Sequence, residues 1–179
     1  MTSSAPRGTI GREVIGAEEL ATRVRDLGAE ITADYQGRAP LLVGVLKGAF
    51  MFMSDLAREI QLPVELDFMA VSSYGDATES SGVVRIVKDL ETDIRDRHVI
   101  LVEDIVDSGL TLRYLHQLLS DRGPASLEVC ALLVREGARS DNVRYIGFPI
   151  PPDFVVGYGL DIAQHYRELD SICVFQPED

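Results

Sequence analysis

The segment from Val99 to Leu112 constrains the fold of this chain more than any other. It begins with four apolar residues in a row, a run typical of a strand buried on both faces of a sheet. Two adjacent carboxylates, Glu103 and Asp104, follow the run, and a small polar turn that contains Gly109 precedes a helical pattern. Strands of this kind belong to parallel sheets covered by helices, so the segment predicts an α/β fold.

The same order of strand, acids, turn and helix suits a sugar-phosphate site. Amides of a small turn and the dipole at a helix N-terminus favour a phosphate group. Carboxylates at the strand end bind sugar hydroxyls, or a metal ion that touches them. The alternative is a buried strand with a solvated acidic end. We favour the site, because the acids, the turn and the helix start arrive in one register.

Strand-like and helical segments alternate along the rest of the chain. Further strands are expected at residues 41–46, 64–73, 83–87 and 127–134. Helices are expected at residues 17–35, 49–60 and 111–122. This alternation predicts a Rossmann-like parallel sheet flanked by helices, with ligands at the carboxyl ends of the strands.

We expect a single domain over residues 1–179, with a core of about 36–140. In the C-terminal part of the chain, short apolar pieces alternate with Pro and Gly, and this pattern differs from that of the core. We therefore expect a small hood lobe, formed by segments of about 1–35 and 141–179, over the carboxyl edge of the sheet.

Charge and composition exclude several classes of function. The net charge is −12, and no basic tract is visible, which disfavours nucleic-acid binding. Lys47 interrupts the longest apolar stretch, so no membrane span is expected, and the polar start resembles no signal peptide. Cys130 and Cys173 have no metal-ligand spacing and are expected to be buried free thiols. These features predict a cytoplasmic protein.

The block from Val99 to Leu112 resembles the phosphoribosyl pyrophosphate signature of the purine phosphoribosyltransferases, specifically their hypoxanthine branch. Three further pieces match the same family in the same order. They are Leu46-Lys47-Gly48, Ser72-Ser73-Tyr74-Gly75, and residues 154–161 followed by Tyr166-Arg167. The four pieces are spread over most of the chain, so the resemblance covers both the expected core and the expected hood. It implies the type I phosphoribosyltransferase fold.

For the ribose 5-phosphate, the resemblance implies that Glu103 and Asp104 bind the ribose hydroxyls. The loop that follows would wrap the 5′-phosphate through its amides and hydroxyls, with Asp107, Ser108, Gly109, Leu110 and Thr111 as the residues involved. Asp107 would also act as the general base or acid on N7 of the purine, since a carboxylate beside a base nitrogen can take its proton.

For the pyrophosphate, the resemblance implies contacts from Lys47, Gly48, Ser73, Tyr74 and Arg167. In the family the Leu-Lys-Gly turn often contains a cis peptide that does not involve proline. The Ser-Tyr pair opens a loop, here residues 74–82, that closes over the reaction centre and excludes water. The alternatives are a surface lysine after a strand and an ordinary hairpin tip.

For the purine, the resemblance implies that the Phe154 ring stacks on the base and the backbone at Val155 reads its edge. Asp161 would lie at the base and bind Mg²⁺, with Glu103 and Asp104 as the other metal-site carboxylates. The alternatives are a core aromatic at Phe154 and a surface ion pair between Asp161 and Arg167.

One position departs from the family pattern. Relatives carry a lysine that donates a hydrogen bond to the 6-oxo group of the purine, and Arg135 stands there in this chain. Arginine still donates, but it is longer and forked, so the exchange is not conservative. A shifted alignment would give the role to Arg139 instead.

The implied function is purine salvage. The chain would transfer the 5-phosphoribosyl group from phosphoribosyl pyrophosphate to hypoxanthine, and to guanine, giving IMP or GMP and pyrophosphate. Homodimers or homotetramers are usual in the family. One alternative is a nucleotide-sensing binding module of the same fold. Such modules usually add a basic RNA- or DNA-binding face or an extra helical domain, and neither is visible in this sequence. Another is a related enzyme that acts on uracil or xanthine and differs only in the base pocket.

Overall fold

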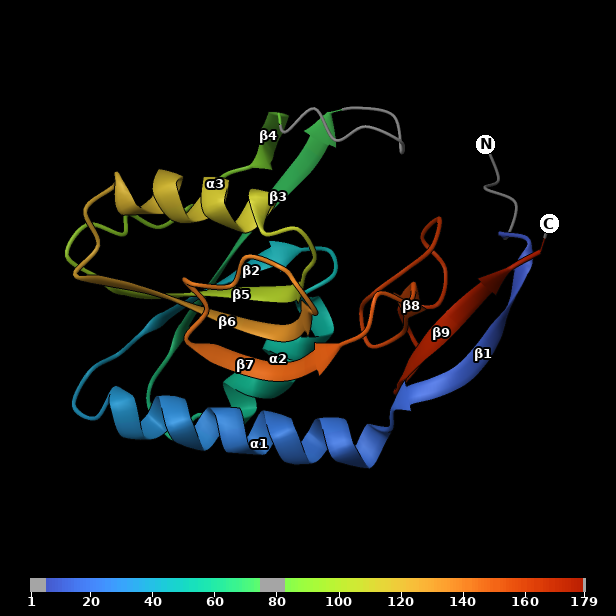
Figure 1. Ribbon diagram of the computed structural model, residues 1–179. Helices are drawn as coiled ribbons and strands as arrows, with labels where there is room; N and C mark the ends of the chain where they lie inside the picture. Colours follow the sequence, from blue (N-terminus) through green and yellow to red (C-terminus); the bar gives the residue numbers. More distant parts are fainter. Residues whose placement is uncertain (1–5, 75–82, 179) are drawn as a thin grey trace.

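A six-stranded sheet forms the centre of the molecule, in the order β4-β3-β2-β5-β6-β7 (Figure 1). The computed structural model describes residues 6–74 and 83–178. The strands of this sheet are β2 (Leu41–Leu46), β3 (Glu65–Tyr74), β4 (Val83–Lys88), β5 (His98–Val106), β6 (Ser126–Arg135) and β7 (Tyr145–Ile150). All neighbours pair in parallel except β3 and β4, which form an antiparallel edge. The predicted parallel sheet is confirmed, with one antiparallel strand added at its edge.

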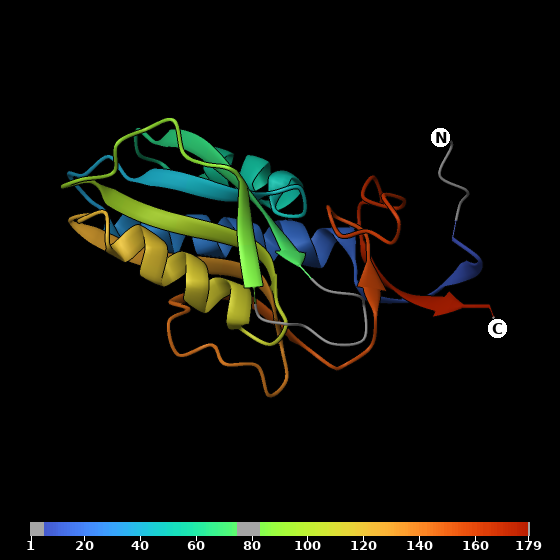
Figure 2. The same ribbon diagram turned by 90° about the horizontal axis from the view of Figure 1, so that it is seen from above.

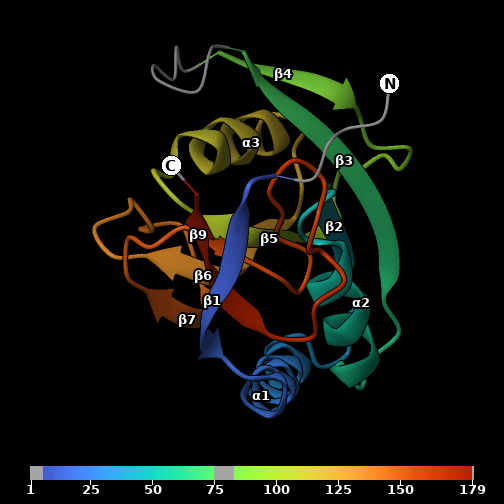
Figure 3. The same cartoon turned by 90° about the vertical axis from the view of Figure 1, so that its right-hand side faces the viewer.

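Helices cover both faces of this sheet, as predicted. Helices α1 (Ala17–Asp34) and α2 (Phe50–Glu59) lie on one face, and α3 (Leu110–Ser120) lies on the other (Figure 3). Side chains of a strand alternate between the two faces. In β5, Ile100 and Val102 therefore pack with α1 and α2, whereas Val99 and Leu101 pack with α3. No helix among the described residues is long and apolar enough to cross a membrane.

A second, three-stranded antiparallel sheet lies beyond the carboxyl ends of the central strands and forms the hood (Figures 1 and 2). It consists of β1 (Gly8–Ile15), β9 (Ile172–Pro177) and β8 (Val155–Val156), in that spatial order. Two elements that the sequence placed in the hood belong to the core instead. Helix α1 packs on α2 in the main apolar cluster, and β7 pairs with β6. The hood is therefore smaller than the expected 1–35 and 141–179.

The topology creates a crevice between β2 and β5. These strands are neighbours, but β2 continues into α2 on one face and β5 continues into α3 on the other. In open α/β sheets, ligands bind where successive connections diverge in this way. The turn at Lys47 and the loop at 107–111 both leave the sheet at this crevice. The fold alone therefore places two of the four matched pieces together.

Candidate active site

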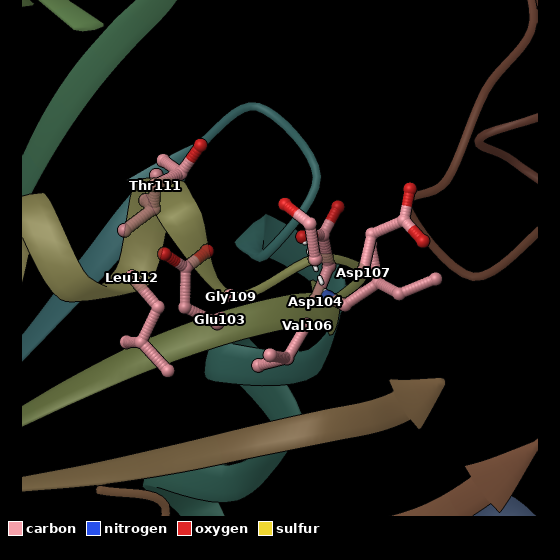
Figure 4. A pocket seen from close by; sticks show the side chains of 10 residues that line it. Glu103, Asp104, Val106, Asp107, Gly109, Thr111 and Leu112 are labelled. Atoms are coloured by element: carbon pink, nitrogen blue, oxygen red, sulfur yellow. Dashed lines mark hydrogen bonds between the residues drawn. The ribbon is translucent and has the colours of Figure 1, made fainter. Parts of the chain in front are cut away.

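The two adjacent acids at the end of β5 point to opposite faces of the sheet. Glu103 continues the Val99 and Leu101 side, and Figure 4 shows its carboxylate beside Thr111 and Leu112 of α3. Asp104 continues the opposite side, toward α2 and the turn after β2. Glu103 is only 6% exposed, so a titratable carboxyl group lies almost out of water here.

Burial shapes the electrostatics of this pair. Desolvation raises the pKa of Glu103 well above its usual value, and the neighbouring charge of Asp104 raises it further. Burial also raises the pKa of Asp104, although the backbone N–H of Ile105 donates to its carboxylate at 2.8 Å and lowers it. Arg167 lowers the pKa of Asp104 and Asp161 raises it, so the hood already reaches this acid. A cation bound beside these two carboxylates would favour their ionised forms, so the pair suits a cationic ligand.

Close contact between Gly48 and Asp104 fixes the turn after β2 against β5. A Cβ atom built on Gly48 would lie 1.6 Å from Oδ2 of Asp104, so only glycine leaves room for the carboxylate. The Leu46–Lys47 peptide bond is cis, as the resemblance implied. The turn and the acid thus form one packed unit.

The loop after β5 encloses a cavity of about 220 Å³ at the N-terminus of α3. Gly109 is the N-cap of α3 and has a φ of 80°, a conformation that glycine adopts without steric cost. The Oγ of Ser108 accepts a hydrogen bond from the backbone N–H of Leu110 at 3.3 Å. The lining is provided by Val45, Leu112 and residues 103–109 and 111. A small polar loop that opens a helix is a suitable site for an anion.

A second cavity, of about 270 Å³, adjoins the first on the hood side. Arg135, Phe154, Val155 and Asp161 all line it, and so does Leu160. Phe154 is 51% exposed, so it is not a core aromatic, and its ring meets that of Phe175 edge to face at 6.5 Å between centroids. Asp104, Ile105 and Asp107 line both cavities. The two spaces therefore meet at these three residues.

Asp107 and Arg135 lie side by side because of strand register. Val106 pairs with Val134; Asp107 directly follows β5, and Arg135 is the last residue of β6. Nε of Arg135 lies 2.6 Å from Oδ1 of Asp107. This contact is an ion pair and not a hydrogen bond, because the Nε–H is not directed at the oxygen. Asp107 is exposed, with 71% of its side chain accessible.

The basic residues from the two lobes converge on Gln164, which the sequence did not indicate. Oε1 of Gln164 accepts hydrogen bonds from Nζ of Lys47 at 3.1 Å and from Nη2 of Arg167 at 3.4 Å. Arg167 also pairs with Asp161 at 2.8 Å and donates to the carbonyl oxygen of Gly159 at 2.6 Å. Asp161 and Arg167 are 24% and 22% exposed, so theirs is a half-buried pair and not a surface one.

The expected lid falls mostly outside the described residues. Ser73 and Tyr74 form the end of β3, where they pair with Val84 and Val83 of β4. That strand end lies at the same carboxyl edge as Lys47, since β2 and β3 run in parallel. Residues 75–82, which the lid would include, lie outside the described residues.

Arg139 does not line the second cavity. Its carbonyl oxygen instead lies 2.4 Å from a Cβ built on Gly109, so the backbone of Arg139 packs against the loop that follows β5. Among the described residues that line the second cavity, Arg135 is the basic side chain. The geometry therefore favours Arg135 over the shifted alignment.

A family model described as a phosphoribosyl transferase domain matches residues 14–163. The chain belongs to the phosphoribosyltransferase family. The match spans the whole central sheet together with its three helices and part of the hood. It confirms both the resemblance and the fold class predicted from the sequence.

Proteins named hypoxanthine-guanine or hypoxanthine phosphoribosyltransferase are similar to this chain over nearly all of its length. The hypoxanthine-guanine phosphoribosyltransferase of Mycobacterium avium is 52% identical, over 95% of this chain and 88% of that protein. The enzyme of the same name from Bacillus subtilis is 47% identical, over 94% of each. The crystal structure of a hypoxanthine phosphoribosyltransferase from Staphylococcus aureus has a TM-score of 0.88 at 42% identity, and the match covers 94% of this chain and 92% of that one.

Proposed function

We propose that this phosphoribosyltransferase acts in purine salvage and transfers the 5-phosphoribosyl group of phosphoribosyl pyrophosphate to hypoxanthine and guanine. The products would be IMP or GMP and pyrophosphate. One observation carries the proposal: the loop cavity and the cavity beside Phe154 share Asp107. A carboxylate at the junction of a sugar-phosphate space and an aromatic-lined space suits a reaction that joins a sugar to a base.

The first cavity and the crevice would hold phosphoribosyl pyrophosphate. The amides and hydroxyls of residues 107–111 would bind the 5′-phosphate at the α3 N-terminus, and Glu103 and Asp104 would bind the ribose hydroxyls. Lys47, Gly48 and Arg167 would contact the pyrophosphate, with Ser73 and Tyr74 from the end of β3. Fixing the sugar in this way brings its C1 to the base, which lowers the barrier through orientation.

Mg²⁺ is the proposed cofactor, and the donor set fits it. The described residues contain no cluster of three or more acidic, His or Cys side chains placed to hold a metal alone. Mg²⁺ usually binds through one or two carboxylates and substrate phosphates, so a site completed by the substrate is expected. Glu103, Asp104 and Asp161 would supply the carboxylates, since Glu103 and Asp104 line the first cavity and Asp104 and Asp161 line the second. When bound, the ion neutralises the charge of the pyrophosphate.

The second cavity would hold the purine. Phe154 would stack on the ring, and the backbone of Val155 and Asp161 would face its edge. Arg135 would donate to the 6-oxo group of hypoxanthine or guanine from Nη2, which has no partner in residues 6–74 and 83–178. Adenine carries a 6-amino donor at that place and suits the site poorly.

Asp107 would act as the general base. As the bond from C1 of the ribose to N9 of the purine forms, the bond from C1 to the pyrophosphate oxygen breaks, and its electron pair leaves with pyrophosphate. The proton on N7 of the purine would pass to the Asp107 carboxylate. The exposed position of Asp107 leaves this carboxylate accessible to the base.

Three further statements belong to the proposal. Residues 1–179 form a single phosphoribosyltransferase domain, the enzyme works in the cytoplasm, and it assembles as a homodimer or homotetramer. The net charge of −12 and the lack of a basic tract oppose a nucleic-acid-binding regulator of the same fold.

Asp107→Asn tests the proposed function. Turnover of hypoxanthine should fall by about 10²–10⁴-fold, the usual contribution of a general acid or base. The dissociation constant for phosphoribosyl pyrophosphate with Mg²⁺, measured by calorimetry, should change less than threefold. Unchanged turnover would remove Asp107 from the mechanism.

A further inference from the structure

The guanidinium of Arg135 joins two parts of the site. Its Nε lies against the Asp107 carboxylate at 2.6 Å. Its Nη1 donates to the carbonyl oxygens of Pro151 and Asp153, at 3.1 Å and 2.9 Å. The Arg135 side chain is 17% exposed, so these contacts are largely shielded from water. One side chain therefore contacts both the reacting carboxylate and the segment that leads into Phe154.

The contacts of Arg135 continue into the hood. The side chain of Asp153 accepts a hydrogen bond from Nη2 of Arg12 in β1 at 2.8 Å. Asp153 directly precedes Phe154, whose carbonyl oxygen accepts from the N–H of Phe175 in β9. The segment 151–153 is thus held from the core side by Arg135 and from the hood side by Arg12, and β9 holds the next residue, Phe154. Its position sets the distance between the Phe154 ring and the carboxylate of Asp107.

A lysine at position 135 would not make these contacts together. A guanidinium presents five N–H donors in a rigid fork, whereas an ammonium group is a compact point charge at the end of a flexible stem. The Nε and Nη1 contacts of Arg135 leave Nη2 for a ligand. A single ammonium would have to divide its donors among Asp107, two carbonyl oxygens and the purine.

We propose that Arg135 is a positioning residue that acts through Asp107, in addition to any contact with the base. This inference rests on the proposed function of Asp107. Arg135 fixes the Asp107 carboxylate relative to the segment 151–153, which leads into Phe154. The undirected ion pair holds the carboxylate near the base while leaving its oxygen lone pairs for the purine N7–H. Arg135 would therefore affect the rate of the chemical step more than the binding of phosphoribosyl pyrophosphate.

The first test compares Arg135→Lys with Arg144→Lys. The second change removes the same fork from an arginine paired with Asp34 and Glu128, away from both cavities. For Arg135→Lys, kcat with hypoxanthine should fall on the order of 10-fold, because a misplacement of about 1 Å can cost up to ~10²-fold. The KM for phosphoribosyl pyrophosphate should change less than twofold. Arg144→Lys should leave both constants unchanged.

A double-mutant cycle shows whether Arg135 acts through Asp107. In the Asp107→Asn background, Arg135→Lys should lower kcat less than twofold, because the carboxylate that it positions is gone. An equal fold-loss in both backgrounds would overturn the inference, since Arg135 would then act on the base alone. An Arg135→Lys enzyme with the full kcat would overturn it as well.

The proposed function and the positioning role fail in different ways. A wild-type chain that transfers to no purine would defeat the function. The positioning role would then be read from crystal structures of the wild type and Arg135→Lys, in which the Asp107 carboxylate and segment 151–153 should move apart. Unchanged positions would overturn it. If Arg135→Lys does not fold, Arg135→Gln, which keeps an amide donor without the charge, takes its place in every measurement.

Discussion

Gly48→Ala should damage the sugar site without unfolding the protein. The added methyl carbon would lie 1.6 Å from Oδ2 and 2.5 Å from Cγ of Asp104. An ordinary contact between carbon and oxygen is about 3.3–3.6 Å, so the carboxylate must retreat by roughly 1.7 Å. Asp104 is a short side chain, so this retreat requires a new side-chain rotamer and turns the carboxylate away from the turn.

The expected cost follows from that displacement. Misplacing a substrate-binding group by about 1 Å can cost ~10²-fold in rate, so kcat/KM for phosphoribosyl pyrophosphate should fall by about two orders of magnitude. Overpacking costs typically 1–3 kcal/mol, and turning one side chain should keep the loss of unfolding free energy near the lower end. The assay varies phosphoribosyl pyrophosphate at saturating hypoxanthine and Mg²⁺ and follows the absorbance of IMP.

Gly16→Ala is the matched control. Its added methyl also meets a carboxylate oxygen, that of the exposed Glu13 at 3.0 Å, but this contact lies at the start of α1, outside both cavities. Its kinetic constants should equal those of the wild type. A Gly48→Ala enzyme with kcat/KM within threefold of the wild type would refute the claim that the contact with Asp104 fixes the sugar site.

Three further predictions concern charge, metal and stability. The raised folded-state pKa of Glu103 means that stability is lost as pH rises from its ordinary value of 4.5 through the folded one. Glu103→Gln should therefore raise the melting temperature at pH 8 and leave it unchanged near pH 4, as scanning calorimetry would show. EDTA should abolish the rise in melting temperature that phosphoribosyl pyrophosphate produces with Mg²⁺, and a rise that persists would argue against the metal. Tyr158→Phe removes the hydrogen bond to Oδ2 of Asp55 at 2.5 Å and should cost about 2 kcal/mol in urea unfolding with little kinetic change.

Local pattern was sufficient to predict the core elements. The apolar run at 41–46 was expected as a buried strand and is β2, which is buried nearly throughout. The helical spacing at 49–60 and 111–122 corresponds to α2 and α3 within two residues at each end. These segments are defined by their own periodicity and by the need to cover a sheet, both of which are readable in one sequence.

Pairing between distant segments was not readable in the same way. Strand β1 was not expected, because Gly8–Ile15 has no continuous apolar run and becomes a strand only by pairing with β9. Tyr145–Ile150 was assigned to the hood, yet it pairs with β6 and completes the central sheet. The core position of α1 depends on its packing with α2, which the amphipathic pattern does not specify.

The sequence indicated which residues form the site better than it indicated the contacts among them. The matched motifs named the acids, the loop and Arg135, and the structure brings these residues together around two adjoining cavities. The bridge that Gln164 forms between Lys47 and Arg167 was missed, because no motif marks a glutamine in a loop. The pairing of Asp107 with Arg135 follows from the register of β5 and β6, which becomes known only with the structure.

The most direct measurement offers hypoxanthine, guanine, xanthine, adenine and uracil separately to the wild-type chain with phosphoribosyl pyrophosphate and Mg²⁺. Formation of nucleotide and pyrophosphate in equal amounts should be fast with hypoxanthine and guanine and at least 10²-fold slower with adenine and uracil, roughly the loss expected when buried donors are left unpaired. Preferred turnover of adenine or uracil would contradict the proposed base site. No turnover of any base, with phosphoribosyl pyrophosphate still bound, would contradict the proposed enzyme function itself.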